Sequence, residues 1–394
     1  MLRQNRDTHL FSPGPKRILA LDGGGIRGIL TVQILKRIES ILRARAGGDE
    51  SFRLCDYFDL IGGTSTGAIL AAGLATGMSA DELEQLYRKL GDAIFEPELL
   101  RWGLLRAKFS KAPLEKALKK QFGDILFGDD TRIHTGLAIM LKRFDTGSPW
   151  VLHNNPRGRY FTPRTGGKAL ANSEFPLCKI IRASTAAPHY FDPEQLTVGR
   201  DRDGKEQVGV FVDGGVSPHN NPALQLLMLA WLRGYALQWP TGADQLLLVS
   251  LGTGYSEAEI PLEETNKPAA VGALLGLASL MDDAMALNEQ MLQWMSVSPT
   301  ARVIDREVGD LATDLPAGGP PLLTYLRYNA RLDGDWLREN VRPDYSDADA
   351  KRLNEMDKPE NMDHLVEVGQ ALARKVEESH FPPAFDLRPE IDPN

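Results

Sequence analysis

The chain has 394 residues, of which 42% are hydrophobic and 25% charged, and its formal net charge is −8. This composition is typical of a globular protein, and the acidic balance argues against a dedicated nucleic-acid binder, whose domain would be basic. Two cysteines, Cys55 and Cys178, are too few for a disulfide framework and suit a reducing compartment. No secretory signal is expected, and the longest apolar stretch, 268–281, is shorter than the roughly 20 residues of a membrane span.

The first part of the chain alternates between predicted strands and helices. A short apolar run at 17–21 predicts a buried strand, and 29–46 has the apolar period of a helix. A second strand at 57–63 is followed by a helix of small residues at 66–77. Two strand–loop–helix units in succession predict an α/β protein with a parallel sheet.

Later elements extend this pattern. A helix is expected to begin at Ser79, which can cap it. Apolar runs predict strands at 134–145, 209–215 and 244–254, and beyond residue 255 the pattern becomes helical.

The segment Gly-Thr-Ser-Thr-Gly at 63–67 lies between the second strand and the small-residue helix. A nucleophile elbow requires this context, because a strained strand-to-helix turn exposes the serine while glycines on both sides leave room. Ser65, flanked by Gly63 and Gly67, is therefore a candidate nucleophile. The alternative is an ordinary turn with an N-capping serine.

A serine nucleophile needs a base. Among the histidines only His189 and His219 lie near predicted strand-end loops, and His219 after Asp213 would complete the triad order Ser, Asp, His. Asp213 itself is the better partner, because it ends an apolar strand, where catalytic groups of α/β sheets collect, and desolvation can raise its proton affinity. Gly214 and Gly215 follow it and permit an unusual turn. The alternative for Asp213 is a turn residue that bonds its own backbone.

The glycines of residues 23–28 match the spacing of the dinucleotide-binding fingerprint. That interpretation lacks an acidic residue at the end of a second strand about 20 positions on, and Asp22 places a carboxylate directly before the loop. The backbone N–H groups of such a loop can instead stabilise the oxyanion of an ester being cleaved.

Three motifs together resemble those of the patatin-like phospholipase family: Asp-Gly-Gly-Gly-Ile-Arg-Gly at 22–28, Gly-Thr-Ser-Thr-Gly at 63–67 and Asp-Gly-Gly at 213–215. The stretch at 183–193 is similar to the segment that precedes the family's catalytic aspartate. The resemblance covers about residues 16–255, with a further similarity at 322–332.

The resemblance implies a three-layer fold, in which a mostly parallel central sheet has helices on both faces and a helical C-terminal extension. It implies a Ser65–Asp213 dyad that uses no metal or cofactor. It also assigns the glycine-rich loop, which would supply the oxyanion hole and a residue that orients the loop or a phosphate: Gly23, Gly24, Gly25, Arg27 and Gly28.

The implied domains are an N-terminal extension (1–15), a catalytic domain (16–255) and a helical region or cap (256–394). The implied activity is hydrolysis of fatty-acyl esters of membrane glycerophospholipids through an acyl-enzyme, by a cytoplasmic protein that associates peripherally with the inner face of the membrane. Some bacterial members are anti-phage effectors switched on by a cyclic nucleotide, so such an activator is a further expectation. The sequence does not decide between a monomer and a homo-oligomer.

Two alternatives stay open at this stage. One is a Ser-His-Asp esterase or thioesterase that uses His219 or His189, and the other is a nucleotide-binding switch protein that uses Gly23 to Gly28 for phosphate.

Two further segments have apolar residues with a second interpretation. Residues 95–123 mix leucine, tryptophan and phenylalanine with many lysines and arginines, which suits docking on anionic lipid headgroups or simply a pair of amphipathic surface helices. Met281, Met285, Leu292 and Met295 follow a near-helical spacing, which suits either an adaptable acyl-chain pocket or core packing.

Overall fold

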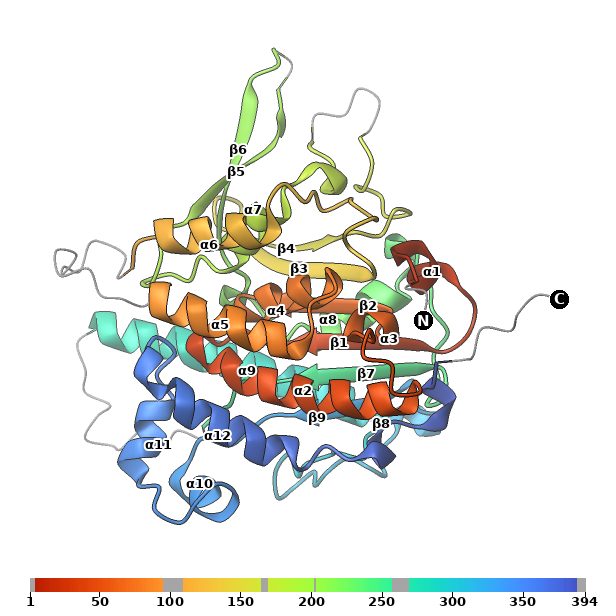
Figure 1. The fold of residues 1–394 in the computed structure, drawn as a ribbon, viewed down its shortest axis with the longest axis vertical. Helices are drawn as coiled ribbons and strands as arrows, with labels where there is room; N and C mark the ends of the chain where they lie inside the picture. Colours follow the sequence, from red (N-terminus) through yellow and green to blue (C-terminus); the bar gives the residue numbers. More distant parts are fainter. Residues whose placement is uncertain (1–3, 95–108, 164–168, 202, 257–268, 388–394) are drawn as a thin grey trace.

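The computed structural model describes residues 4–94, 109–163, 169–201, 203–256 and 269–387 (Figure 1). Its centre is a sheet of nine strands in the order β5-β6-β3-β2-β1-β7-β9-β8, with β4 paired to β3. The strands are β1 (Lys16–Leu21), β2 (Leu60–Thr64), β3 (Gly136–Arg143), β4 (Ser148–His153), β5 (Glu194–Arg200), β6 (Glu206–Asp213), β7 (Leu246–Leu251), β8 (Ser296–Val297) and β9 (Leu323–Tyr328). The neighbours from β3 through β2, β1, β7 and β9 to β8 pair in parallel, whereas β4, β5 and β6 form antiparallel pairs. The mostly parallel sheet predicted from the sequence is confirmed.

Helices cover both faces of this sheet, as the pleat of β1 shows. Leu19 and Leu21 pack with the helices of one face, whereas Ile18 and Ala20 pack with those of the other, because successive side chains of a strand point to opposite sides. The longer helices are α2 (Gly28–Arg45), α4 (Thr66–Ala75), α5 (Ala80–Ile94), α6 (Ala112–Phe122), α7 (Leu177–Ser184), α8 (Ala223–Trp231), α9 (Ala269–Trp294) and α12 (Met362–Ala373). The shorter ones are α1 (Arg6–Phe11), α3 (Leu54–Tyr57), α10 (Gly334–Asn340) and α11 (Asp347–Leu353). The three-layer architecture follows from this arrangement.

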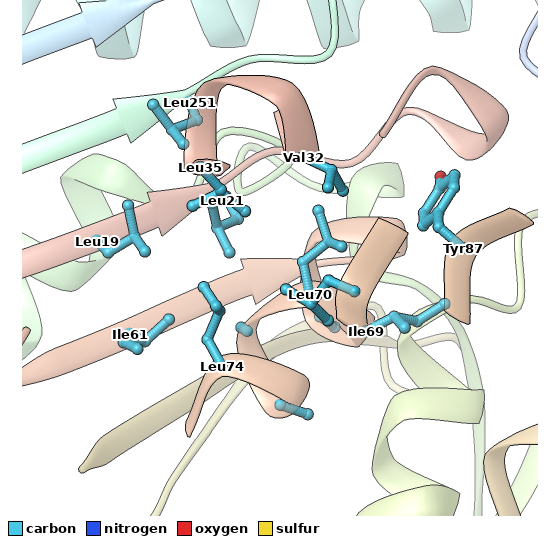
Figure 2. Packing of buried hydrophobic residues seen from close by; sticks show 14 of the residues in the cluster. Leu19, Leu21, Val32, Leu35, Ile61, Ile69, Leu70, Leu74, Tyr87 and Leu251 are labelled. Carbon is cyan, nitrogen blue, oxygen red and sulfur yellow. The ribbon is translucent and has the colours of Figure 1, made fainter. Parts of the chain in front are cut away.

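The core on the α2 and α4 face is continuous from the sheet to α5. Figure 2 shows side chains of one buried cluster that come from β2 (Ile61), α2 (Leu35), α4 (Leu70 and Leu74) and α5 (Tyr87). All five side chains are buried. This packing fixes α4 against the sheet, and the residue directly before α4 is Ser65, the serine that the sequence identified.

Residues 256–394, expected to be helical, also contribute β8 and β9 to the same sheet. The strand β9 lies beside β7 in parallel, so its backbone is paired inside the sheet. The run Leu-Thr-Tyr-Leu-Arg-Tyr at 323–328 lacks the alternation of a half-exposed strand, and all six of its residues are buried, Thr324 and Arg327 included.

Asp213 lies at a strand end, as the sequence argument expects, but on a strand that runs antiparallel to its neighbour. The strand β6 pairs with β3 only near the carboxyl ends of both strands. Thr64, the last residue of β2, pairs with Met140 on one side of β3, and Leu141 pairs with Asp213 on the other. The carboxyl ends of β2 and β6 therefore meet at the same edge of the sheet.

None of the helices in the described ranges is both long and apolar enough to cross a lipid bilayer.

The close packing of α2 yields a stability prediction. Leu35 is 0% exposed and Leu287 of α9 is 55% exposed. Leu35→Ala should lower the free energy of unfolding by about 2–5 kcal/mol because it leaves a cavity, whereas Leu287→Ala should change it by less than about 0.5 kcal/mol. Urea unfolding followed by circular dichroism measures both, and equal effects of the two substitutions would contradict the packing described.

Candidate active site

Ser65 occupies a strained turn between β2 and α4. Its backbone has φ 54° and ψ −122°, a conformation that non-glycine residues adopt only where the surroundings enforce it. A Cβ atom on Gly63 would lie 2.0 Å from the carbonyl oxygen of Gly67, and one on Gly67 would lie 2.2 Å from that of Leu21. The Ser65 N–H donates to Ser184 Oγ at 2.9 Å. These contacts give Ser65 the backbone geometry of a nucleophile elbow.

The Ser65 hydroxyl faces the carboxylate of Asp213. Ser65 Oγ donates to Asp213 Oδ2 at 2.5 Å, and the Gly215 N–H donates to Oδ1 of the same carboxylate at 2.7 Å. Burial raises the pKa of Asp213 to about 6, against the opposing effects of these two hydrogen bonds and of the Arg182 guanidinium. A carboxylate with this pKa is ionised at neutral pH and is still basic enough to accept a proton.

The histidines take no part in this pair. Among the hydrogen bonds of the described residues, none joins a histidine ring to Ser65 or Asp213. His219 contributes its carbonyl oxygen, which accepts a hydrogen bond from Thr64 Oγ1 at 2.5 Å. His189 has φ 72° and its ring packs edge-on against Tyr190. The structure therefore favours the aspartate over either histidine as the base.

The glycine-rich loop lies beside Ser65 and is held by its neighbours. The Gly23 N–H donates to the Asn220 carbonyl at 3.1 Å, and Thr253 Oγ1 donates to the Gly23 carbonyl at 2.9 Å. The Gly23 N–H is thus engaged within the protein, unlike the N–H groups of Gly24 and Gly25, for which no acceptor is found among the described residues. Both of these glycines line the same cavity as Ser65.

The remaining motif residues pack closely around this loop. A Cβ on Gly28 would lie 2.6 Å from the Tyr87 hydroxyl, and one on Gly214 would lie 2.3 Å from the Met140 carbonyl oxygen. Tyr87 also donates to the Gly25 carbonyl. This hydroxyl therefore lies against Gly28, the first residue of α2.

Arg27 is partly buried at the start of α2. Burial lowers its pKa, and the carboxylate of Asp282 on α9 opposes this effect. Its Nε has no acceptor in the described part of the chain. A role in orienting a phosphate stays a prediction.

A cavity of about 440 Å³ opens next to the dyad. Its lining is mainly apolar and includes Ile69, Leu90, Leu114, Phe191 and Met281, with Ser65 and Asp213 among the few polar groups. This is the character of a site that takes a hydrocarbon chain and holds a polar linkage at one point. Of the predicted methionine cluster, Met281 lines the cavity, whereas Leu292 and Met295 pack with the core behind the sheet.

Comparison with known proteins decides the family. A model of the patatin-like phospholipase family matches residues 19–227, a range that holds the elbow, the glycine-rich loop and Asp213. The chain belongs to the patatin-like phospholipase family. It is 35% identical over 245 residues to a cGAMP-activated phospholipase of Escherichia coli, a match that covers 60% of this chain and 62% of that protein.

Two further relatives extend the comparison. The chain is 31% identical over 288 residues to a cGAMP-activated phospholipase of Vibrio cholerae, covering 70% of this chain and 75% of the relative. It is 31% identical over 255 residues to calcium-independent phospholipase A2-gamma of Rattus norvegicus, covering 62% of this chain and 29% of the relative. The matched region is therefore less than two thirds of the E. coli and rat proteins.

A buried ion pair in this patatin-like chain was not expected from the sequence. Asp22, directly before the glycine-rich loop, accepts hydrogen bonds from Arg327 of β9 at 2.7 and 3.1 Å. Burial disfavours the charged form of Arg327. The carboxylates of Asp22 and Glu289 nevertheless raise the pKa of Arg327, so the guanidinium stays charged. Glu289 of α9 in turn accepts from Arg302 Nε at 2.6 Å. Arg327 thus connects the last third of the chain to the loop beside the nucleophile.

The raised pKa of Asp213 predicts the pH dependence of Ser65 reactivity. Inactivation by an organophosphonate should be slow near pH 5 and rise to a plateau by about pH 7, with a midpoint at the pKa of about 6, because only the ionised carboxylate accepts the hydroxyl proton. The rate of covalent labelling, followed by mass spectrometry, measures this profile. Ser65→Ala provides the unlabelled control, and a rate that does not change over this range would contradict Asp213 as the base.

The ion pair yields a second prediction. Arg327→Met should destabilise the fold by about 3–5 kcal/mol, because the Asp22 carboxylate is left buried without its partner. The double variant Asp22→Asn with Arg327→Met should recover part of this loss, because no unpaired charge remains. Urea unfolding of the single and double variants gives the coupling free energy, and strictly additive losses would contradict the pairing.

Proposed function

We propose that the chain hydrolyses fatty-acyl esters of glycerophospholipids with Ser65 as the nucleophile and Asp213 as the general base. The observation that carries this proposal is the 2.5 Å hydrogen bond between Ser65 Oγ and Asp213 Oδ2, two residues that line a mainly apolar cavity. Membership of the patatin-like phospholipase family supports it. The names of the E. coli, V. cholerae and rat relatives, all phospholipases, support the substrate class.

The reaction follows from the arrangement of these groups. Ser65 Oγ attacks the ester carbonyl carbon while its proton passes to Asp213, and the carbonyl oxygen becomes an oxyanion. The N–H groups of Gly24 and Gly25, which have no acceptor in the described ranges, are the donors we assign to that oxyanion. When the tetrahedral intermediate collapses, the Asp213 proton goes to the departing alcohol oxygen and an acyl-enzyme remains.

Water completes the cycle. Asp213 removes a proton from the water as its oxygen attacks the acyl carbon, and it returns that proton to Ser65 Oγ when the fatty acid leaves. Each proton taken by the carboxylate is given back within the same half-reaction. The mechanism therefore needs only this one base.

Regulation by a cyclic nucleotide is part of the proposal. The E. coli and V. cholerae relatives are named as cGAMP-activated phospholipases, at 35% and 31% identity. We propose that this chain is likewise activated by a cyclic dinucleotide and that it reaches its lipid by peripheral contact with a membrane. A role in anti-phage defence would follow from such activation and stays a prediction.

Lipid hydrolysis by purified variants tests the dyad. Ser65→Ala and Asp213→Asn should each reduce the release of fatty acid from phosphatidylglycerol vesicles by about 10³-fold or more, because nucleophile and base act as a unit. His219→Ala should keep activity within a fewfold of the unsubstituted protein, because the His219 contact with Thr64 is made by its backbone carbonyl. The assay is run with and without cGAMP, since a chain that requires activation would be silent in its absence.

Substantial activity in Asp213→Asn, or loss of activity in a folded His219→Ala, would overturn the dyad. Circular dichroism of each variant separates loss of chemistry from loss of fold. A protein that is labelled at Ser65 by an organophosphonate and yet cleaves no phospholipid would retain the dyad and reject the substrate class.

A further inference from the structure

A second hollow lies between α5 and α6, behind one wall of the catalytic cavity. This groove of about 890 Å³ is lined by apolar side chains that include Leu86, Leu90 and Ala117. The lining also holds Lys89 of α5 and two lysines of α6, together with Gln85 and with Gln121, whose Nε2 donates to Met78 Sδ. Its volume falls in the range of small-molecule sites.

The charge of the groove is positive on a protein whose net charge is −8. Lys116 and Lys120 are one helical turn apart, so they present two ammonium groups to the same groove. Neither forms an ion pair with any residue that the structure describes. The acidic residue of the lining, Glu82, is engaged as part of the α5 cap, where its carboxylate accepts the Ser79 N–H at 2.8 Å.

The lysines, amides and apolar side chains of the lining indicate which class of ligand the groove can bind. Ammonium groups attract phosphate oxygens, and amides form hydrogen bonds with the same oxygens or with a polar ring edge. The leucine and alanine side chains of the lining can pack against a flat or apolar group attached to the phosphate. A phosphodiester with a base or a hydrocarbon portion meets both requirements.

The groove is also connected to the catalytic machinery through α5. Leu90 lines both the groove and the catalytic cavity. One turn earlier, the Tyr87 hydroxyl lies 2.5 Å from Thr66 Oγ1, next to the nucleophile, and donates to the Gly25 carbonyl. A displacement of α5 would therefore change the contacts that Tyr87 makes with both the elbow and the loop of the proposed oxyanion donors.

We propose that the α5–α6 groove binds a phosphodiester ligand through Lys116 and Lys120, and that its occupancy is transmitted to the active site by Leu90 and Tyr87. The transmission to the active site rests on the proposed phospholipase function, whereas the binding of the ligand does not. The phosphodiester has two sources, a soluble cyclic dinucleotide or the headgroup of an anionic lipid.

Binding is measured on full-length Ser65→Ala protein, which keeps the groove and cleaves no probe. The probes are cGAMP, followed by calorimetry, and vesicles of phosphatidylglycerol and phosphatidylcholine, followed by sedimentation. Adding Lys116→Gln and Lys120→Gln should weaken binding of at least one probe by about tenfold or more, because two attractive charges are lost. Lys119→Gln, on the same helix but outside the groove lining, should change it less than about twofold.

The two probes separate the sources of the ligand. Lysine-dependent binding of cGAMP identifies a soluble dinucleotide, and lysine-dependent binding of vesicles alone identifies a lipid headgroup. Both results support the groove. No binding of either probe, or binding that responds equally to Lys119→Gln and to the groove variants, overturns it.

Transmission is tested by Tyr87→Phe in the active protein. This variant should bind the probe as the unsubstituted protein does, while the increase in ester hydrolysis on adding the probe should fall by about tenfold or more, because the contacts with Gly25 and Thr66 are lost. If the probe increases ester hydrolysis by Tyr87→Phe as much as by the unsubstituted protein, the proposed transmission is overturned. Failure of the phospholipase function would appear separately, as absence of hydrolysis in a protein that still binds its probe.

Discussion

The whole site depends on a carboxylate kept out of water beside a serine hydroxyl. Asp213 is 4% exposed and lies within 2.5 Å of Ser65 Oγ. In water an aspartate is too weak a base to activate a serine, and burial corrects this by raising its pKa to about 6. Desolvation destabilises the ionised form, so the surrounding fold has to be stable enough to hold it. The hydrogen bonds from Ser65 and Gly215 limit that cost.

The rest of the structure serves to keep these two groups in register. The elbow holds Ser65 at a positive φ, and the extended packing of α4 against β2 and α2 secures that turn. The strand β3 sets the relative position of the two residues, because it pairs with β2 on one side and with the end of β6 on the other. The ion pair of Asp22 with Arg327 then ties the glycine-rich loop to β9, so the C-terminal region completes the site as well as the sheet.

Local patterns were sufficient to single out the segments that we propose as catalytic. The strand–turn–helix context identified Ser65, and the glycines on either side are needed because their Cβ atoms would meet backbone oxygens. The loop at 22–28 was predicted as a set of oxyanion donors. The structure shows the Gly23 N–H engaged with Asn220, while those of Gly24 and Gly25 have no acceptor among the residues it describes. Tyr87 gave no signal, because it resembles an ordinary residue of a buried helix. Ser184 and Arg327 lie in the segments 183–193 and 322–332 that resemble the family, but no local pattern assigned either residue a role. Residues 95–108 of the predicted lipid-docking segment lie outside the described part of the chain.

The sequence by itself determined the mostly parallel α/β architecture and singled out Ser65, the glycine-rich loop and Asp213 as candidates, because hydrophobic period and turn chemistry act over a few neighbouring residues. Tertiary structure decided that Asp213 faces Ser65, and it decided the supporting contacts. Asp213 is 148 positions from Ser65 along the chain, and Arg327 is 305 from Asp22. Contacts at that separation follow from strand order and register, which no local pattern specifies. The positive groove between α5 and α6 likewise exists only once the two helices are packed together.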